Sequence, residues 1–322
     1  MLVSEAYSLI TWNIGTPDDT SNRAINAQCT NKIILLKLQE QLNSYANITK
    51  GIHDVFSFSQ GNTNTFVAAP TLALRSQGYF FGYVVVNATR FPFDFRGASD
   101  ALNTFRTAPV TGIMNWVMPW NAGHTQYLTG FPKSSTSAKT TTLSAGVNSS
   151  ATTLPVVSTA GYMADFGRVT IGSEKILYQY KDATNFYGCE RGVEQTTAAS
   201  HNTSDTVTEN NVILLYARLP ESIALTNPSS DTIPSNILTH VLEPCDEHME
   251  GIIKVTSYNL LNKIDPDRAK AYLVGFDERG IPLVYSQYQK DIKKGYGKTR
   301  LNVNVRDPYL SETGIAFGTN LY

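Results

Sequence analysis

The spacing of apolar residues predicts helices near both ends of the chain. An apolar side recurs at helical intervals over Leu2–Ile14, and a longer helix with broad apolar coverage is expected over Ser21–Tyr45. Near the other end, Pro244 and the acids after it open a helix expected over Cys245–Asn262. An Asp-Pro pair then starts a third apolar-periodic run, Asp265–Phe276.

Between these helices the period changes to two, which indicates strands. Val55–Phe58 and Phe66-Val67 favour a hairpin, and Gly78–Val86 is the strongest strand pattern in the chain. Gly112–Trp120 is a further strand that ends near a proline. Val212–Leu219 is expected to return the chain to the same sheet.

Residues 140–208 show short β-type runs between turn signals and no helical period, which indicates an inserted β-module. A Ser/Thr/Lys-rich linker leads into it. Tight turns are expected at Gly172-Ser173 and Asp182-Ala183. The candidate strands are Thr152–Val157, Arg168–Ile171, Glu174–Tyr180 and Ala183–Cys189.

These patterns together predict an α+β protein with three parts. Residues 1–133 and 210–278 are expected to form a helical bundle body with an antiparallel β-region. Residues 134–209 are expected to form a small all-β domain inserted into that body. Residues 279–322 show little helical period and are expected to form an extended C-terminal arm.

The distribution of charge argues against a dedicated nucleic-acid binder. The 322 residues carry a net charge of −1, and charged residues make up only 16% of them. Affinity for nucleic acid comes mainly from phosphate neutralisation, which this balance does not supply. A sparsely charged polar surface suits contact with other protein, although it is also found in Ser/Thr-rich monomeric proteins.

The arm is the basic part of the chain. From Arg279 to Arg306 the net charge is +6, so the rest of the chain carries −7. This contrast predicts that the arm docks on an acidic neighbour, including another copy of the chain, and a solvated basic loop is the alternative. The candidate interaction residues are Arg279, Lys290, Lys293, Lys294, Lys298, Arg300, Arg306, Tyr285, Tyr288 and Tyr296.

The cysteines and the N-terminal residues indicate the cellular compartment in which the chain is expected to fold. Cys29, Cys189 and Cys245 are odd in number and widely spaced, so we expect reduced thiols and a cytosolic folding site. No signal peptide is expected at the N-terminus, and no apolar run is long enough for a transmembrane helix.

Few residue patterns suggest chemistry. His240, Cys245, Asp246 and His248 lie close in sequence and could hold zinc, but a helix start with capping acids explains them equally. The chain has no G-x-S-x-G elbow, no phosphate-binding loop and no G-x-G-x-x-G fingerprint. No catalytic residue, metal ligand or cofactor is therefore expected.

Two further patterns have a functional and a structural interpretation. Arg191 and His201 could form a catalytic pair, or could satisfy carbonyl groups in an ordered turn in which Gly192 has a positive φ. The aromatic runs Tyr79–Phe81 and Trp116–Trp120 could bind a sugar, or could fill the core of a sheet. In both cases the structural interpretation is favoured.

The insert resembles a small β-module found in tail and connector proteins of tailed bacteriophages. That module has a strand with Gly-x-Glu and a tyrosine, then Arg-Gly, a Thr-Thr pair and a histidine before its last strand. In this chain those places are held by Gly172, Glu174, Tyr178, Arg191, Gly192, Thr196, Thr197 and His201. The resemblance covers the insert.

The body more weakly resembles the head-to-tail connector (adaptor) proteins that sit beneath the phage portal. It shares a long early helix ending in Leu42-Asn43, a β-region, and a late helix pair with an Asp-x-x-Arg-Ala run beginning at Asp265. The chain departs from that family in its length and in carrying the insert between the sheet and the late helices.

The resemblance implies a structural virion protein with no enzymatic activity and no cofactor. It implies a homo-oligomeric ring, commonly dodecameric, around the DNA exit channel, with the phage portal protein and tail proteins as partners. Genomic DNA would pass through without specific binding, no membrane would be involved, and assembly would take place in the host cytoplasm. The alternatives are another phage tail, collar or decoration component, and a carbohydrate-binding protein.

Overall fold

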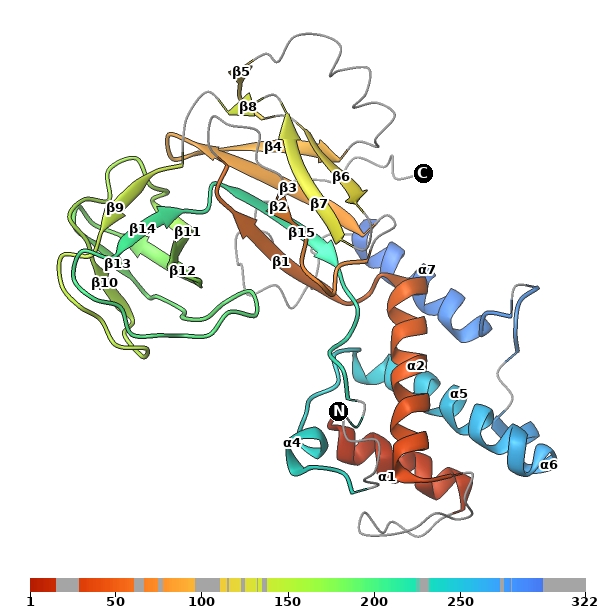
Figure 1. Ribbon diagram of the computed structural model, residues 1–322. Coiled ribbons are helices and arrows are strands. Elements are labelled where there is room, and N and C mark those ends of the chain that lie inside the picture. The colour runs from red at the N-terminus through yellow and green to blue at the C-terminus, as the bar shows by residue number, and fades with distance from the viewer. Residues whose placement is uncertain are drawn as a thin grey trace. The chain divides into compact units, whose positions relative to one another are not determined.

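The chain divides into two units (Figure 1). We call the first the helical unit; it consists of Met1–Ile52 and the described part of Ala217–Asn302. We call the second the β unit; it consists of His53–Tyr216. The computed structural model describes residues 1–15, 29–60, 67–74, 78–95, 111–114, 116–122, 125–131, 133–134, 138–223, 225, 232–272, 275–278 and 280–297.

The predicted fold class is wrong, because the chain is mostly β and its body is not a helical bundle. Strand accounts for 34% and helix for 31%, and the strands form two curled, nearly closed sheets. The central sheet belongs to the β unit together with the inserted module, whereas the prediction grouped it with the helices. Several strands are too short to show a period of two, so the sequence pattern gave the longer helices too much weight.

The helical unit is built on two long helices. The 19-residue α2 packs against α5 and α7, and α1 packs mainly against α5 (Figure 1). Thr30 caps α2 by accepting a hydrogen bond from the Ile33 amide at 3.3 Å, whereas the start predicted at Ser21 lies outside the described residues. The helices are α1 (Val3–Ile14), α2 (Asn31–Thr49), α4 (Ser235–Leu238), α5 (Asp246–Ile264), α6 (Pro266–Ala269), the 3₁₀ turn η1 (Lys270–Tyr272) and α7 (Leu283–Gly297).

The late helices agree only partly with the sequence pattern. The helix predicted over Cys245–Asn262 is α5, with Cys245 as its N-cap and Asp246 and Glu247 in its first turn. Asp265 caps the next segment by accepting from the Arg268 amide at 3.1 Å. That segment is only α6 followed by η1, so it is shorter than the predicted run to Phe276.

The predicted extended arm is also wrong over its first half, where α7 is a 15-residue helix. Tyr285 is fully buried, its ring lies edge-on to that of Tyr45, and its hydroxyl donates to Gln41 Oε1 at 3.2 Å. Tyr288 stacks on His248 with 4.0 Å between ring centroids. These tyrosines give α7 an apolar stripe that fixes it to the core of the helical unit.

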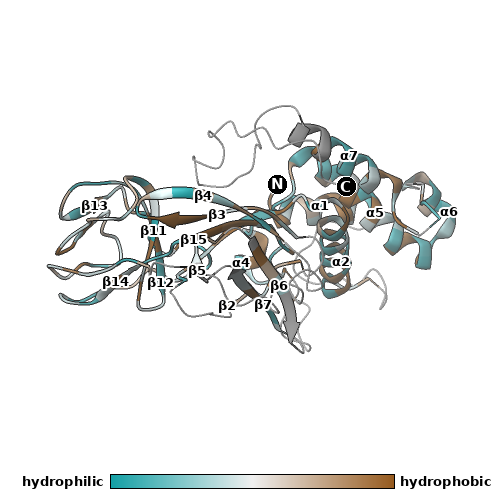
Figure 2. Cartoon of the chain, turned by 90° about the horizontal axis from the view of Figure 1, so that it is seen from above, coloured by the Kyte–Doolittle hydropathy of each residue, from teal (hydrophilic) through white to brown (hydrophobic). Residues whose placement is uncertain are grey.

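The first sheet of the β unit has seven strands in the order β1-β15-β3-β4-β6-β7-β2. Figure 2 shows β3 and β15 as hydrophobic bands, and every residue of β15 is buried. Asn87 and Ala88 join β3 to β4 in a two-residue turn with φ of 50° and 61°. The strands are β1 (His53–Phe58), β2 (Val67–Ala68), β3 (Tyr79–Val86), β4 (Thr89–Phe95), β6 (Trp116–Ala122), β7 (Thr125–Phe131) and β15 (Val212–Ala217), beside a separate pair, β5 (Thr111–Gly112) and β8 (Lys133–Ser134).

The second sheet, which we call the barrel, has six strands in the order β10-β13-β12-β11-β14-β9. An antiparallel bridge between Leu143 and Val156 brings the two outer strands together, so the sheet nearly closes on itself. Leu154, Val169 and Phe186 are 0% exposed. The strands are β9 (Thr140–Thr142), β10 (Thr153–Pro155), β11 (Asp165–Ile171), β12 (Glu174–Lys181), β13 (Asn185–Tyr187) and β14 (Thr206–Glu209).

We predict that Tyr285→Ala destabilises the helical unit by about 3 kcal/mol, because it removes a fully buried aromatic ring. Gln287→Ala, at an exposed position of the same helix, is the matched control and should leave stability nearly unchanged. Urea denaturation followed by circular dichroism measures both. Equal stabilities for the two variants would mean that α7 does not pack as described.

Candidate functional site

Four of the eight residues that carry the phage resemblance, Glu174, Arg191, Gly192 and His201, meet at the carboxylate of Glu174, the first residue of β12. Arg191 binds it in a bidentate manner, Nε to Oε1 and Nη2 to Oε2, both at 2.8 Å. The backbone amides of Gly192 and Ala199 donate to it at 3.0 and 3.1 Å. His201 Nε2 lies 2.7 Å from Oε2 and completes what we call the Glu174 cluster.

Within the Glu174 cluster, the negative charge of the carboxylate is balanced by the groups that surround it. The carboxylate is 1% exposed, and burial alone would raise the pKa of Glu174. Hydrogen bonds from Arg191, Ala199 and His201 outweigh that effect and hold the pKa below its ordinary value. Both oxygens of Glu174 already accept several hydrogen bonds. Glu174 is therefore not available as a base or as a metal ligand.

Arg191 orders a turn by donating to carbonyl groups, as the structural interpretation predicted, whereas His201 contacts the Glu174 carboxylate and not a carbonyl. Arg191 also donates to the carbonyls of Asn148 and Ala199, both at 2.6 Å. Gly192 has a φ of +65°, and a Cβ there would lie 2.8 Å from the Ala198 amide nitrogen. No side chain larger than hydrogen fits this position without displacing the backbone.

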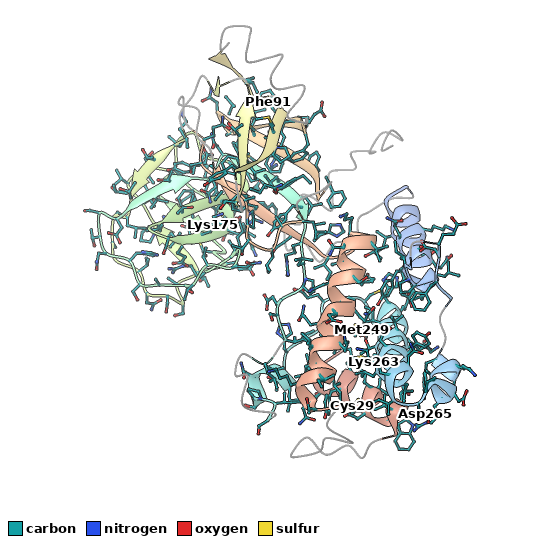
Figure 3. All side chains as sticks on the ribbon, turned by 45° about the vertical axis from the view of Figure 1, so that its right-hand side comes forward. Cys29, Phe91, Lys175, Met249, Lys263 and Asp265 are labelled. Atoms are coloured by element: carbon teal, nitrogen blue, oxygen red, sulfur yellow. The ribbon has the colours of Figure 1, made fainter. Side chains whose placement is uncertain are left out.

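A second buried carboxylate, Glu194, joins the barrel to the first strand of the seven-stranded sheet. Its oxygens accept from the Ser57 amide at 2.7 Å and the Ser57 hydroxyl at 2.5 Å. They also form ion pairs with Arg168 Nη1 at 2.9 Å and Lys175 Nζ at 2.7 Å. Lys175, labelled in Figure 3, reaches further to the Ser57 carbonyl and lies 4.1 Å from the centre of the Phe56 ring.

Two asparagines complete this junction where the chain leaves the barrel. Asn211 pairs with the backbone of Gln60, accepting from its amide at 2.7 Å and donating to its carbonyl at 2.9 Å. Asn210 donates to the Ser57 hydroxyl at 3.0 Å and accepts from Thr170 at 2.9 Å. The side-chain amides thus continue the strand pairing where the two sheets meet.

An open hollow of about 420 Å³ lies beside the junction. Ser57 Oγ bonds to the Glu194 carboxylate, as the nucleophile of a hydrolase bonds to its base. Both oxygens of Glu194 are already ion-paired, however, one with Arg168 and the other with Lys175. The hollow is lined by Phe56, Ser57, Phe58, Ser59, Val67, Thr170, Lys175, Thr208 and Asn210, a set without an available acid–base pair.

Glu209, the last residue of β14, is a buried acid of a different kind. It is 5% exposed, its Oε1 has no hydrogen-bond partner, and its Oε2 is 3.4 Å from the Lys139 amide nitrogen. Burial raises the pKa of Glu209 to about 7, against the smaller opposing effects of the Lys139 amide and charge. Ionising this carboxyl therefore costs stability.

The basic residues predicted to interact with a partner lie shortly before α7, on it or after it. Lys290 is exposed on α7, and Lys293, Lys294 and Tyr296 belong to the same helix. Tyr285 is a core residue and is not available to a partner, which corrects its assignment as an interaction residue, and Tyr288 is half-buried against His248. Arg279, Lys298, Arg300 and Arg306 lie outside the described residues.

The residues considered for zinc do not converge. His240 Nδ1 lies 3.9 Å from Glu221, and His248 Nδ1 bonds to the Tyr45 hydroxyl at 2.7 Å. Asp246 pairs with the Met1 amino group at 2.8 Å. Among the described residues, no group of three or more His, Cys, Asp and Glu side chains is arranged to hold a metal ion.

The first aromatic run lies within the seven-stranded sheet. Tyr79 stacks on Phe95 and donates to Gln126 at 2.5 Å, and Phe80 contacts the His53 ring. These contacts agree with the packing interpretation. The side chains of Trp116 and Trp120 lie outside what the structure describes.

Sequence reasoning missed Glu194, Glu209 and the asparagine pair. Glu194 and Ser57 are 137 residues apart, and no local pattern links them. One signal was present in the sequence. The polar run Glu209-Asn210-Asn211 lies between two β-type segments, and an ordinary turn at this place would not need buried side-chain amides. Such a run at a predicted sheet boundary indicates side chains that pair with a backbone.

No protein-family model matches this chain, and no curated protein matches it in sequence. The resemblance to phage proteins therefore stays a prediction. None of the helices in the described residues combines the length and the apolar character that crossing a membrane requires.

We predict that Glu174→Gln lowers barrel stability by about 3–5 kcal/mol, because it leaves the buried Arg191 guanidinium without its counter-charge. Amide hydrogen exchange should accelerate between Arg191 and His201. Asp165→Asn, at an exposed carboxyl of the same barrel, is the control. Exchange rates indistinguishable from wild type would show that Glu174 does not organise the turn.

Glu209→Gln, in contrast to Glu174→Gln, should stabilise the folded protein, and only at higher pH. The folded protein holds the Glu209 proton more tightly than the unfolded chain, so this residue's contribution is complete below about pH 4.5 and is lost as the pH rises to about 7. The variant cannot ionise, so relative to wild type it should gain up to about 3 kcal/mol between pH 5 and pH 8. Urea denaturation at both pH values measures this, and a constant difference would contradict it.

Proposed function

We propose that this chain is a structural protein of a tailed-phage virion, which forms a ring in the head-to-tail connector beneath the portal. In this proposal the ring surrounds the DNA channel and contacts the portal and tail proteins. The protein acts by binding its neighbours and catalyses no reaction. DNA passes through without sequence-specific contact, consistent with the net charge of −1.

The observation that carries the proposal is the structural role of four of the eight residues that resemble the phage module. Glu174, Arg191, Gly192 and His201 form one buried cluster in which each side chain or backbone group satisfies another. Polar residues that satisfy one another and hold a loop in place are what a structural building block requires. A catalytic motif would leave a nucleophile or base able to react.

A second observation supports rigid placement of the module. Glu194, Asn210 and Asn211 fix the barrel to β1 and to the segment after it through buried side-chain hydrogen bonds. A module that transmits position within an assembly needs a stiff joint, whereas a module that merely decorates a surface can use a mobile linker.

The test is direct measurement of assembly. We expect the purified chain, alone or with its portal protein, to form a closed oligomer in mass photometry, and electron microscopy to place that ring between head and tail. A chain that stays monomeric with and without the portal protein would overturn the proposal. A location on the capsid or tail surface would instead identify a decoration or collar component.

A further inference from the structure

The outer face of α1 carries apolar side chains that nothing in the described chain covers. Its inner face, which includes Val3 and Ile10, is buried in the core of the helical unit. Its outer face presents Glu5, Leu9 and Trp12, at intervals of four and three residues. Trp12 is 81% exposed and Leu9 46% exposed, although exposed aromatic side chains on a helix are costly to solubility.

The outer face of α7 carries a stripe with the same spacing. Leu283, Gln287 and Lys290 are all exposed and face away from the buried Tyr285. Leu283 is 51% exposed. We call Glu5-Leu9-Trp12 the α1 stripe and Leu283-Gln287-Lys290 the α7 stripe.

The two stripes are complementary when their helices run antiparallel. Each covers eight residues, or about 10 Å of helix from the first to the last. An antiparallel pairing places Glu5 opposite Lys290, Leu9 opposite Gln287 and Trp12 opposite Leu283. Acid then meets base at one end of the contact, and apolar meets apolar at the other. This pairing also places the N-terminal half of α1 beside the C-terminal half of α7, where the helix dipoles attract.

The two stripes belong to helices that pack at opposite ends of α2. On α1, Tyr7 donates to Asn31, the first residue of α2, at 2.5 Å. On α7, Gln289 donates to the carbonyl of Ile48, close to the last residue of α2, at 2.7 Å. These two points are about 25 Å apart along the helix, so one copy cannot pair its own stripes.

We propose that the α1 stripe docks on the α7 stripe of a neighbouring copy of this chain. The proposal rests on the self-assembly in the proposed function and names the surfaces that carry it. Because the two surfaces differ, each copy uses one toward each neighbour, and the contact repeats head to tail. Such a heterologous contact generates a ring when the rotation from each copy to the next brings the last copy back to the first.

Site-specific cross-linking tests the contact directly. Two variants are made in a Cys245→Ser background, which removes the exposed thiol and retains the buried Cys29 and Cys189. One variant carries Trp12→Cys and the other Leu283→Cys. We expect a disulfide-linked dimer when the two are mixed under mild oxidation, and none when either is oxidised alone.

The other outcomes are equally informative. A dimer from Trp12→Cys alone would mean that α1 pairs with α1 across a two-fold axis, which overturns the proposal. A ring that forms normally without any mixed cross-link would overturn the α1–α7 contact and leave the proposed function standing. Failure of the wild-type chain to associate at all, alone and with its portal protein, would remove both.

Charge reversal provides a second readout that does not depend on thiols. Lys290→Glu and Glu5→Lys should each weaken self-association at least tenfold in sedimentation velocity, and the double variant should restore most of it. Glu5 also accepts from the Leu2 amide at 2.7 Å, so circular dichroism of each monomer is needed to confirm that α1 stays folded. Single variants that assemble like wild type would contradict the pairing of Glu5 with Lys290.

Discussion

The β unit depends on a buried carboxylate that is completely satisfied by hydrogen bonds. Between Tyr187 and Thr206 the chain contains no helix or strand. This segment is ordered around Glu174 through Arg191, the Gly192 and Ala199 amides, and His201. A loop of this length has a large conformational entropy to lose. One charge with several donors offsets that entropy because burial strengthens each hydrogen bond.

The same loop carries the residue that joins the two sheets. Glu194 lies within the segment that Glu174 orders, with a φ of +56° that places its side chain against Ser57, Arg168 and Lys175. The Glu174 cluster therefore does more than close one turn of the barrel. It sets the geometry of the junction, and a disturbance at Glu174 reaches β1 through the loop backbone.

Local chemistry made part of this structure predictable. Pro244 and the acids after it indicated the start of α5, and the turn residues around Gly172 indicated the β11–β12 hairpin. The helix α7 was not predicted. Tyr285, Tyr288 and Ile292 do have helical spacing, but the lysines and glycines of the same segment made this pattern hard to recognise. The overall balance of strand and helix was misjudged because strands such as β5 and β8 have two residues each. The pairing of the junction could not be predicted, since its partners are distant in sequence; the polar run Glu209-Asn210-Asn211 marked only its position.

The junction also covers the outer edge of β1, which is an edge strand of the seven-stranded sheet. Edge strands invite other chains to add to them, since their backbone groups are unpaired. Here the Val55 amide is bound by the Asp54 carboxylate, the Ser57 amide by Glu194, and the Ser57 carbonyl by Lys175. Side chains thus take the place of a neighbouring strand, so the edge of β1 offers few free backbone groups to which a strand of another chain could add.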